Sequence, residues 1–151
     1  MPGSPGRDAP LIVVAAALVD DLRSPTRLLA ARRHRPAALA GRWEFPGGKV
    51  HPDEDPLAAL HREIHEELGV AIEVGDEVPG PDAGAWQISP RYALRLWTAT
   101  VVSGEPQPLA EHDELRWLEL GTWSSVPWLD ADVRIVHLLT VSHGQGPAAQ
   151  P

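Results

Sequence analysis

The sequence of 151 residues contains no cysteine, which excludes a disulfide framework, a zinc–thiolate site and a cysteine nucleophile. It also has no apolar run long enough to span a membrane. The longest apolar stretch, Leu11–Val19, is preceded by Arg7 and Asp8 and followed by no convincing small-residue cleavage site, so it does not indicate a secretory signal peptide. We therefore expect a cytoplasmic protein with no membrane partner.

Positive charge is scarce as well. The 13 Lys and Arg residues are outnumbered by 21 Asp and Glu residues, which gives a formal net charge of −8. A protein that binds nucleic-acid polymers usually carries a basic stripe, so this balance argues against such a partner. It does not exclude a nucleotide substrate, because a bound metal ion can neutralise phosphate charge locally. The length indicates one domain, and the sequence does not decide between a monomer and a homodimer.

Strands and two helices alternate along the predicted domain. Residues 11–142 are expected to form it, and residues 1–10 and 143–151, rich in Pro, Gly and other small residues, are expected to be disordered tails. Strands are predicted at Leu11–Val19, Arg27–Arg33, Val70–Val78, Gln87–Val102 and Leu115–Leu118, with a short extended piece at Trp43–Phe45. A final helix is predicted at Ala131–Val141. This order indicates an α/β fold.

The other predicted helix has clear start and stop signals. Asp55 is a plausible N-cap, Pro56 suits the first turn, and Gly69 can take the left-handed conformation that ends a helix. Apolar residues recur between these signals at spacings of three and four, at Leu57, Leu60, Ile64 and Leu68. The helix is therefore expected to bury one face.

Three carboxylates lie within one turn of this helix. At roughly 100° per residue, Glu63 and Glu67 fall side by side and Glu66 lies further round. They repel one another unless a cation neutralises them, and such oxygen ligands suit Mg²⁺, with Mn²⁺ as a possible substitute. Arg62 lies one turn before Glu66 and can pair with it. Taken alone, such a segment is more often the solvated acidic face of an amphipathic helix.

The surrounding residues favour the metal site. Gly48–Val70, called the box below, has the pattern Gly-x5-Glu-x7-Arg-Glu-x-x-Glu-Glu-x-Gly and resembles the motif of the Nudix hydrolases at every fixed position. Trp43–Val50 resembles the entry into the box in MutT-type members, which hydrolyse nucleoside triphosphates. The resemblance implies an α/β/α sandwich with a mixed sheet, in which the box forms a loop, a helix and a second loop.

The same resemblance implies roles for individual residues. Metal binding is carried over to Glu63, Glu66, Glu67 and the backbone carbonyl of Gly47. The supporting positions of the box are Gly48, Glu54, Arg62 and Gly69, with Arg62 and Glu54 orienting the loop and the carboxylates. Lys49 is expected to contact a phosphate or a box carboxylate, unless it is solvated. A further carboxylate after the box is common in this family as a base or extra metal ligand, and Glu111 is the preferred candidate over Glu114.

Base recognition is assigned to three positions, each with an alternative. Arg33 resembles an arginine that contacts phosphate or base, and its neighbour Arg32 is the alternative. Phe45 would stack on the base or be buried in the core. Asp132 would accept a hydrogen bond from the amino group of cytosine, or cap the last helix, with Asp130 as a weaker candidate for both roles.

These features favour one function over three others. The resemblance implies a metal-dependent enzyme that converts nucleoside triphosphates to monophosphates and pyrophosphate, in the manner of pyrophosphohydrolases for CTP, dCTP and modified relatives that sanitise the nucleotide pool. An 8-oxo-dGTP diphosphatase is the first alternative, and an ADP-ribose or nucleotide-sugar diphosphatase the second. A non-catalytic nucleotide-binding domain is disfavoured, because such domains typically lose box carboxylates that are all present here.

Overall fold

The computed structural model describes residues 9–143, so the predicted tails lie almost entirely outside the described residues. In chain order the elements are β1 (Leu11–Leu18), β2 (Arg27–Arg33), a 3₁₀ helix (Ala37–Leu39), β3 (Trp43–Glu44), β4 (Gly47–Lys49), α2 (Pro56–Leu68), β5 (Ala71–Val78), β6 (Trp86–Gln87), β7 (Tyr92–Ser103), β8 (His112–Glu119) and α3 (Asp130–Ser142). Among the described residues, no helix combines the length and the apolar character needed to cross a membrane.

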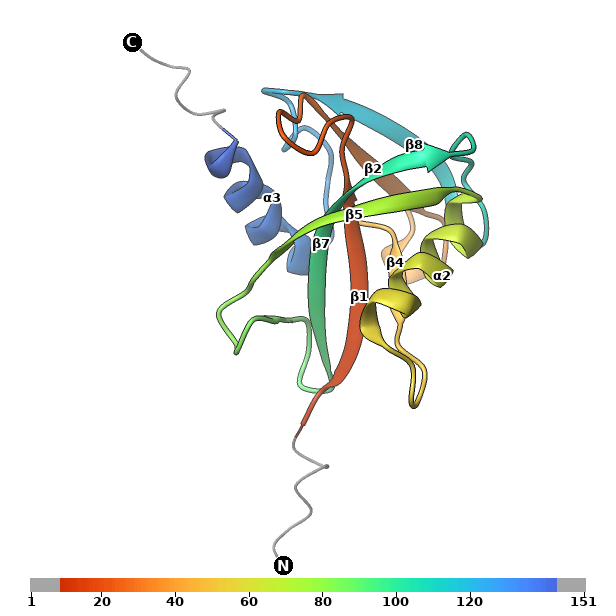
Figure 1. Cartoon of the computed structure of the whole chain (residues 1–151), viewed down its shortest axis with the longest axis vertical. Coiled ribbons are helices and arrows are strands. Elements are labelled where there is room, and N and C mark those ends of the chain that lie inside the picture. Colours follow the sequence, from red (N-terminus) through yellow and green to blue (C-terminus); the bar gives the residue numbers. More distant parts are fainter. Residues whose placement is uncertain (1–8, 144–151) are drawn as a thin grey trace, which may run out of the picture.

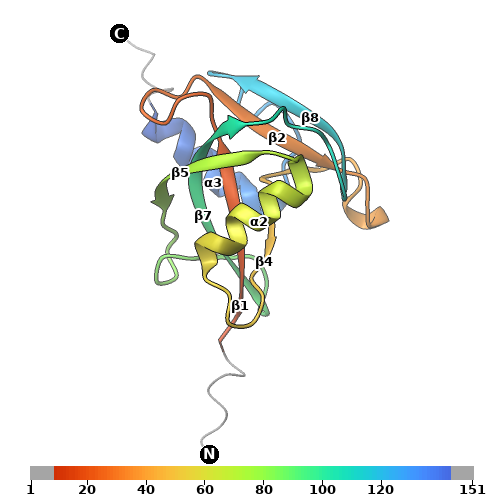
Figure 2. The same ribbon diagram turned by 45° about the vertical axis from the view of Figure 1, so that its right-hand side comes forward.

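The strands form two sheets in the middle of the molecule. The larger sheet has the order β4–β1–β7–β5, with β6 also paired to β7, and the smaller sheet has the order β3–β2–β8. β1 runs parallel to β7 and antiparallel to β4, so the sheet is mixed, as predicted. Figure 1 shows α3 on one side of the strands and α2 on the other. Figure 2, turned by 45°, shows α2 in front of β1 and α3 behind it, which is the predicted α/β/α sandwich.

Alternation along β1 explains the two layers. Its side chains point to opposite faces of the sheet in turn. Val14, Ala16 and Leu18 pack in one core cluster with Leu60, Ile64 and Leu68 of α2. Ala15 and Ala17 pack, with Val19 just beyond the strand, in a second cluster with Ile135, Val136 and Leu139 of α3. The sheet therefore has an apolar core on each face, and each core is closed by one helix.

The predicted strands differ from the structure mainly at their boundaries. The segment Gln87–Val102 was predicted to be mostly strand with Pro90 limiting its pairing, and the structure agrees: residues 88–91, which include Pro90, separate β6 from β7. β8 begins at His112, three residues before the predicted Leu115. The pairing of Gly47–Lys49 with β1 was not predicted, since this glycine-rich segment lacks the alternating pattern of a strand.

The boundaries of α2 are confirmed. The side chain of Asp55 accepts hydrogen bonds from the amides of Leu57 and Ala58 at 3.0 and 3.2 Å. At the other end Gly69 has φ 74° and its amide donates to the carbonyl of His65. The cap and the stop fix where the helix begins and ends, and therefore which of its residues face the sheet.

Replacing Asp55 with alanine is expected to lower the free energy of unfolding by about 1 kcal/mol, because two amides of the first turn lose their acceptor. Asp55→Asn retains a side-chain oxygen at the same place and should keep most of this stability. Urea denaturation of both variants measures the difference. An equal loss in both would mean that the negative charge at the helix start, rather than the hydrogen bonds, stabilises α2.

Candidate active site

A cleft of about 660 Å³ opens between β4, α2 and the start of α3. Its lining residues come from segments far apart in the sequence and fall into two groups. One group is rich in glycine and charge: Arg33, Glu44, Gly47, Gly48, Lys49, His51, Glu63, Glu67 and Glu111. The other is mostly apolar: Val13, Val14, Ala15, Phe45, Ile88, Leu94, Leu129, Ala131 and Asp132. The cleft thus has a charged end and an apolar end that contains one acid.

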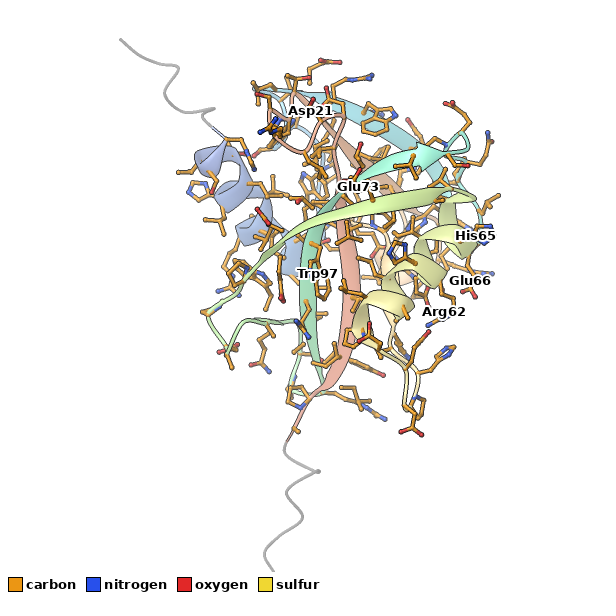
Figure 3. All side chains as sticks on the ribbon, in the orientation of Figure 1. Asp21, Arg62, His65, Glu66, Glu73 and Trp97 are labelled. Atoms are coloured by element: carbon orange, nitrogen blue, oxygen red, sulfur yellow. The ribbon has the colours of Figure 1, made fainter. Side chains whose placement is uncertain are left out.

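The three glutamates of the box helix α2 are not equivalent in the structure. The side chains of Glu63 and Glu67 are 14% and 11% exposed and both line the cleft, whereas that of Glu66 is 56% exposed. Figure 3 shows Arg62 and Glu66 at the outer margin of α2. Glu67 Oε1 accepts a hydrogen bond from the amide of Gly47 at 3.3 Å. This contact ties the last turn of α2 to the loop that enters the box.

The two glycines at the start of the box are required by close approach. A Cβ added at Gly47 would collide with the carbonyl oxygen of Val14 and lie 2.6 Å from the Cα of Ala15. A Cβ added at Gly48 would collide with the carboxylate of Glu63. Gly47 therefore permits β4 to pair with β1, and Gly48 leaves the space that the acid occupies.

Arg62 fastens the box loop to the helix. Its guanidinium contacts both carboxylate oxygens of Glu54, at 2.8 and 2.9 Å, one oxygen of Glu63 at 2.9 Å and the carbonyl of Lys49 at 3.1 Å. The predicted pairing with Glu66 is present at 3.3 Å, yet it is one of several contacts. The hydrogen bonds from Arg62 are the main cause that lowers the pKa of Glu54 to about 2.

A strap, defined here as Gly104–Glu111 between β7 and β8, carries the predicted post-box carboxylate. The amides of Gln107 and Leu109 donate to the carbonyls of Leu68 and Glu67 at 3.0 and 3.1 Å. These two bonds fill carbonyls at the end of α2 that have no partner within the helix. They also bring Glu111 to the cleft, whereas Glu114 is not among the cleft-lining residues.

Arg33, and not its neighbour Arg32, faces the cleft. Arg33 donates to Glu111 at 2.6 Å and to Glu44 at 3.0 Å. Arg32 pairs instead with Asp113 and Glu114, at 2.8 and 3.2 Å. The sequence left Arg32 as the alternative to Arg33, and Glu114 as the alternative to Glu111. The structure places Arg33 and Glu111 together in the cleft.

Two residues of this network were not predicted from the sequence. Glu44 accepts one hydrogen bond from Arg33 and forms a 2.8 Å contact with Nε2 of His112. The His112 side chain has no exposed area. Glu44 stands between two buried aromatic residues in the sequence, and this polar interruption of an apolar segment is the one signal that could have pointed to it.

The apolar end of the cleft is built around Phe45 and Asp132. The amide of Leu129 donates to the carbonyl of Trp43 at 2.8 Å, which holds the start of α3 against β3. Phe45 is 4% exposed and its ring centroid lies 4.8 Å from that of Trp128, so it is part of the core and also forms a cleft wall.

The structure contradicts the helix-cap alternative for Asp132. α3 begins at Asp130 and its N-cap is Leu129, with no side-chain cap hydrogen bond, so neither aspartate is a cap. Asp132 instead accepts a hydrogen bond from the amide of Phe45 at 3.4 Å, and its side chain is buried. Burial, followed by the charge of Glu44, raises the pKa of Asp132 to about 8 against the effect of that hydrogen bond.

The charged end of the cleft fits a hard divalent cation. Burial is the main cause that raises the pKa of Glu67 to about 8, and the charges of Glu44, Glu63 and Glu111 raise it further. This excess of carboxylate is what an oxygen-seeking cation such as Mg²⁺ would neutralise. Within residues 9–143 no three acidic or histidine side chains are already arranged to hold a metal ion. Glu63 is turned toward Arg62 and Glu67 toward Gly47, so their side chains would have to rotate.

The remaining predicted residue, Lys49, is an exposed residue of the cleft lining. Its ammonium group is 5.2 Å from the ring centroid of Tyr92, which is a cation–π distance. Lys49 therefore lines the cleft, while its ammonium group packs against Tyr92, which is not among the cleft-lining residues.

These two layers of helix around a mixed sheet, with buried acids facing a cleft, place the chain in a class of small α/β/α hydrolases. The sequence model of the NUDIX domain matches residues 10–137. The CTP pyrophosphohydrolase of Escherichia coli K12 is 32% identical over 139 residues, which cover 91% of this chain and 98% of that protein.

Two further proteins are similar over most of the chain. A Mycobacterium tuberculosis protein with the provisional name 8-oxo-dGTP diphosphatase 2 is 42% identical over 124 residues, covering 80% of this chain and 82% of its own. The solution structure of the E. coli ORF135 protein has a TM-score of 0.73 at 32% identity and covers 97% of this chain and 100% of that one. The chain belongs to the Nudix hydrolase family and is an enzyme that acts on phosphoric anhydrides.

Proposed function

We propose that the protein is a metal-dependent nucleoside triphosphate pyrophosphohydrolase that prefers cytosine nucleotides and serves to sanitise the nucleotide pool. The observation that carries this proposal is the two-part cleft. Its charged end suits a metal-bound polyphosphate, and its apolar end, with Phe45 and the buried Asp132, suits a base. The relatives named as acting on CTP and on 8-oxo-dGTP are both consistent with a triphosphate substrate.

The residues at the charged end would hold and orient the polyphosphate. Glu63 and Glu67, with Glu66 and the carbonyl of Gly47, would hold Mg²⁺ or Mn²⁺, which when bound neutralises phosphate charge and lowers the pKa of a water molecule. Glu111, as the further carboxylate at this end, would accept a proton from the attacking water. One water and one nucleoside triphosphate then give a monophosphate and pyrophosphate.

Arg33 and Lys49 would supply the positive charge that the polyphosphate meets. Arg33 contacts Glu44 and Glu111 in the structure, so a phosphate would compete with these two carboxylates for its guanidinium. Because Lys49 is an exposed residue of the cleft lining, it would contact the outer part of the polyphosphate.

Asp132 offers a physical reason for a cytosine preference. With a pKa of about 8 the group is a neutral acid at pH 7, with one hydrogen-bond donor and one acceptor. Cytosine presents an amino donor beside the N3 acceptor, which matches such a pair. Ionised aspartate has acceptors alone, and these match the two adjacent N–H donors of guanine instead. The 42% identity to the Mycobacterium tuberculosis relative keeps 8-oxo-dGTP as the second candidate substrate.

A substrate panel at pH 7 and pH 9 with Mg²⁺ tests this assignment. It should contain CTP, dCTP, 5-methyl-dCTP, dGTP, 8-oxo-dGTP and ADP-ribose, with products separated by ion-exchange chromatography. We expect the highest kcat/KM for a cytosine compound at pH 7, and a smaller advantage at pH 9 as Asp132 ionises.

Asp132→Asn is the matched variant, since an amide keeps one donor and one acceptor at every pH. It should retain the cytosine preference at pH 7. At pH 9 it should not show the decrease in this preference that is expected of the wild type. Preference of the wild type for 8-oxo-dGTP at both pH values would contradict the cytosine assignment. Hydrolysis of ADP-ribose alone would contradict the triphosphate assignment.

A further inference from the structure

His112 lies between Glu44 and Glu67, two acids of the charged end of the cleft. It is the first residue of β8, and its side chain is completely buried. Its Nε2 atom is 2.8 Å from Glu44 Oε2, and its Nδ1 atom is 3.8 Å from Glu67 Oε1. One imidazole thus faces a carboxylate from β3 and a carboxylate from the box helix α2.

The Nδ1 atom is a buried polar group without a hydrogen-bond partner among the residues that the structure describes. Buried polar atoms are rarely left unpaired, because desolvation costs free energy that only a hydrogen bond returns. A shift of about 1 Å would bring Nδ1 and Glu67 Oε1 within the usual hydrogen-bond distance.

The Nε2 contact has consequences beyond Glu44. The oxygen of Glu44 that meets His112 is the same one that accepts from Arg33 at 3.0 Å. Arg33 in turn donates to Glu111 at 2.6 Å. The position of the imidazole therefore determines the position of Glu44, and Glu44 helps to determine where the guanidinium of Arg33 points.

We propose that His112 is a positioning residue that holds two parts of the cleft in register, with Nε2 fixing Glu44 and the guanidinium of Arg33, and Nδ1 fixing the carboxylate of Glu67. The inference rests on the proposed function of the cleft in binding a polyphosphate and a divalent cation. His112 has no contact with solvent and takes no part in the chemistry itself.

Two substitutions separate the two edges of the ring. The amide nitrogen of glutamine falls near the position of Nε2, and that of asparagine falls near Nδ1. His112→Gln should keep the contact with Glu44 and lose the one with Glu67. His112→Asn should keep the contact with Glu67 and lose the one with Glu44. His137→Gln is the matched control, because His137 is exposed on α3.

The variants are compared by steady-state kinetics on the best nucleoside triphosphate and by Mn²⁺ binding to the nucleotide-free protein, followed by electron paramagnetic resonance. For His112→Gln we expect kcat and Mn²⁺ affinity to fall about tenfold each with KM unchanged. For His112→Asn we expect KM to rise about tenfold with Mn²⁺ affinity unchanged. The control should behave as wild type in both measurements.

Thermal denaturation of each variant measures its stability and so distinguishes a structural role of His112 from a positioning role. One contrary outcome is that both variants lose stability while kcat, KM and Mn²⁺ affinity stay unchanged. Another is that kcat, KM and Mn²⁺ affinity change by the same amounts in His112→Gln and His112→Asn. In either case His112 has a structural role only and the proposal is wrong. If the wild type hydrolyses no triphosphate, yet His112→Gln binds Mn²⁺ more weakly than His112→Asn does, the positioning role stands and the substrate assignment fails instead.

Discussion

Glu67→Gln is expected to lower kcat by about a thousandfold without unfolding the protein. Among the box acids Glu67 is the most buried, and it has the most perturbed pKa. Glutamine can still accept the hydrogen bond from the amide of Gly47, so the link between α2 and β4 should survive. What is lost is one negative oxygen ligand for the cation, and metal-ion catalysis contributes several kcal/mol, or about three powers of ten in rate.

The same variant should change the pH dependence of stability in metal-free buffer. The ordinary pKa of this carboxyl is 4.5, and folding raises it to about 8, so the folded protein binds the proton more tightly than the unfolded chain. Wild-type stability therefore contains a loss that develops as the pH rises from about 4.5 to about 8. Glutamine removes this loss, so Glu67→Gln should be more stable than wild type at pH 8.5 and nearly equal at pH 4.

Chemical denaturation in EDTA at these two pH values, together with kinetics in Mg²⁺, measures both effects. Glu73→Gln is the matched control, since Glu73, labelled in Figure 3, is exposed on β5 and is not among the cleft-lining residues. Full activity of Glu67→Gln would remove Glu67 from the metal site. If the free energy of unfolding of Glu67→Gln differed from that of the wild type by the same amount at pH 4 and at pH 8.5, the carboxyl would not be buried as described.

Gly48→Ala is expected to lower kcat by about a hundredfold while the free energy of unfolding changes little. The added methyl group would collide with the carboxylate of Glu63, which is the movable end of a side chain, so the fold can adjust by turning that side chain away. The cost falls on catalysis, because displacing a reacting or ligating group by about 1 Å can reduce a rate by two powers of ten.

Gly47→Ala provides the contrast on the adjacent residue. There the methyl group meets the backbone of Val14 and Ala15, which cannot turn aside without breaking the pairing of β1 with β4. We expect a loss of about 1–3 kcal/mol or more in the free energy of unfolding. Urea denaturation and kcat are measured for both variants. Equal destabilisation by the two substitutions would contradict the distinction between a structural glycine and a glycine that leaves room for an acid.

What the sequence predicts well is local. The cap at Asp55, the stop at Gly69 and the neighbouring positions of Glu63 and Glu67 all follow from helical geometry within 15 residues. The continuous apolar run of β1 is likewise typical of a strand that is buried on both faces.

What the sequence does not reveal depends on strand pairing. Glu44 and His112 are 68 residues apart and meet because β2 pairs with both β3 and β8. The ladder between β2 and β8 shifts at Arg32 and Arg33, so that Arg32 lies opposite Glu114 and Arg33 opposite His112. This one-residue irregularity separates the two arginines and the two glutamates that the sequence left as alternatives. No property of the individual residues encodes it.

The strap also bears on how related proteins can diverge. Its two attachments to α2 use the amides of Gln107 and Leu109, while Pro106 and Pro108, which have no amide hydrogen, occupy the alternate positions. A main-chain attachment of this kind tolerates many side chains, provided that the donors keep their spacing. Substitution can therefore erase the recognisable sequence of residues 104–110 while the carboxylate that follows them stays where it is. An insertion of one residue would move it, so length rather than identity is the constraint in this segment.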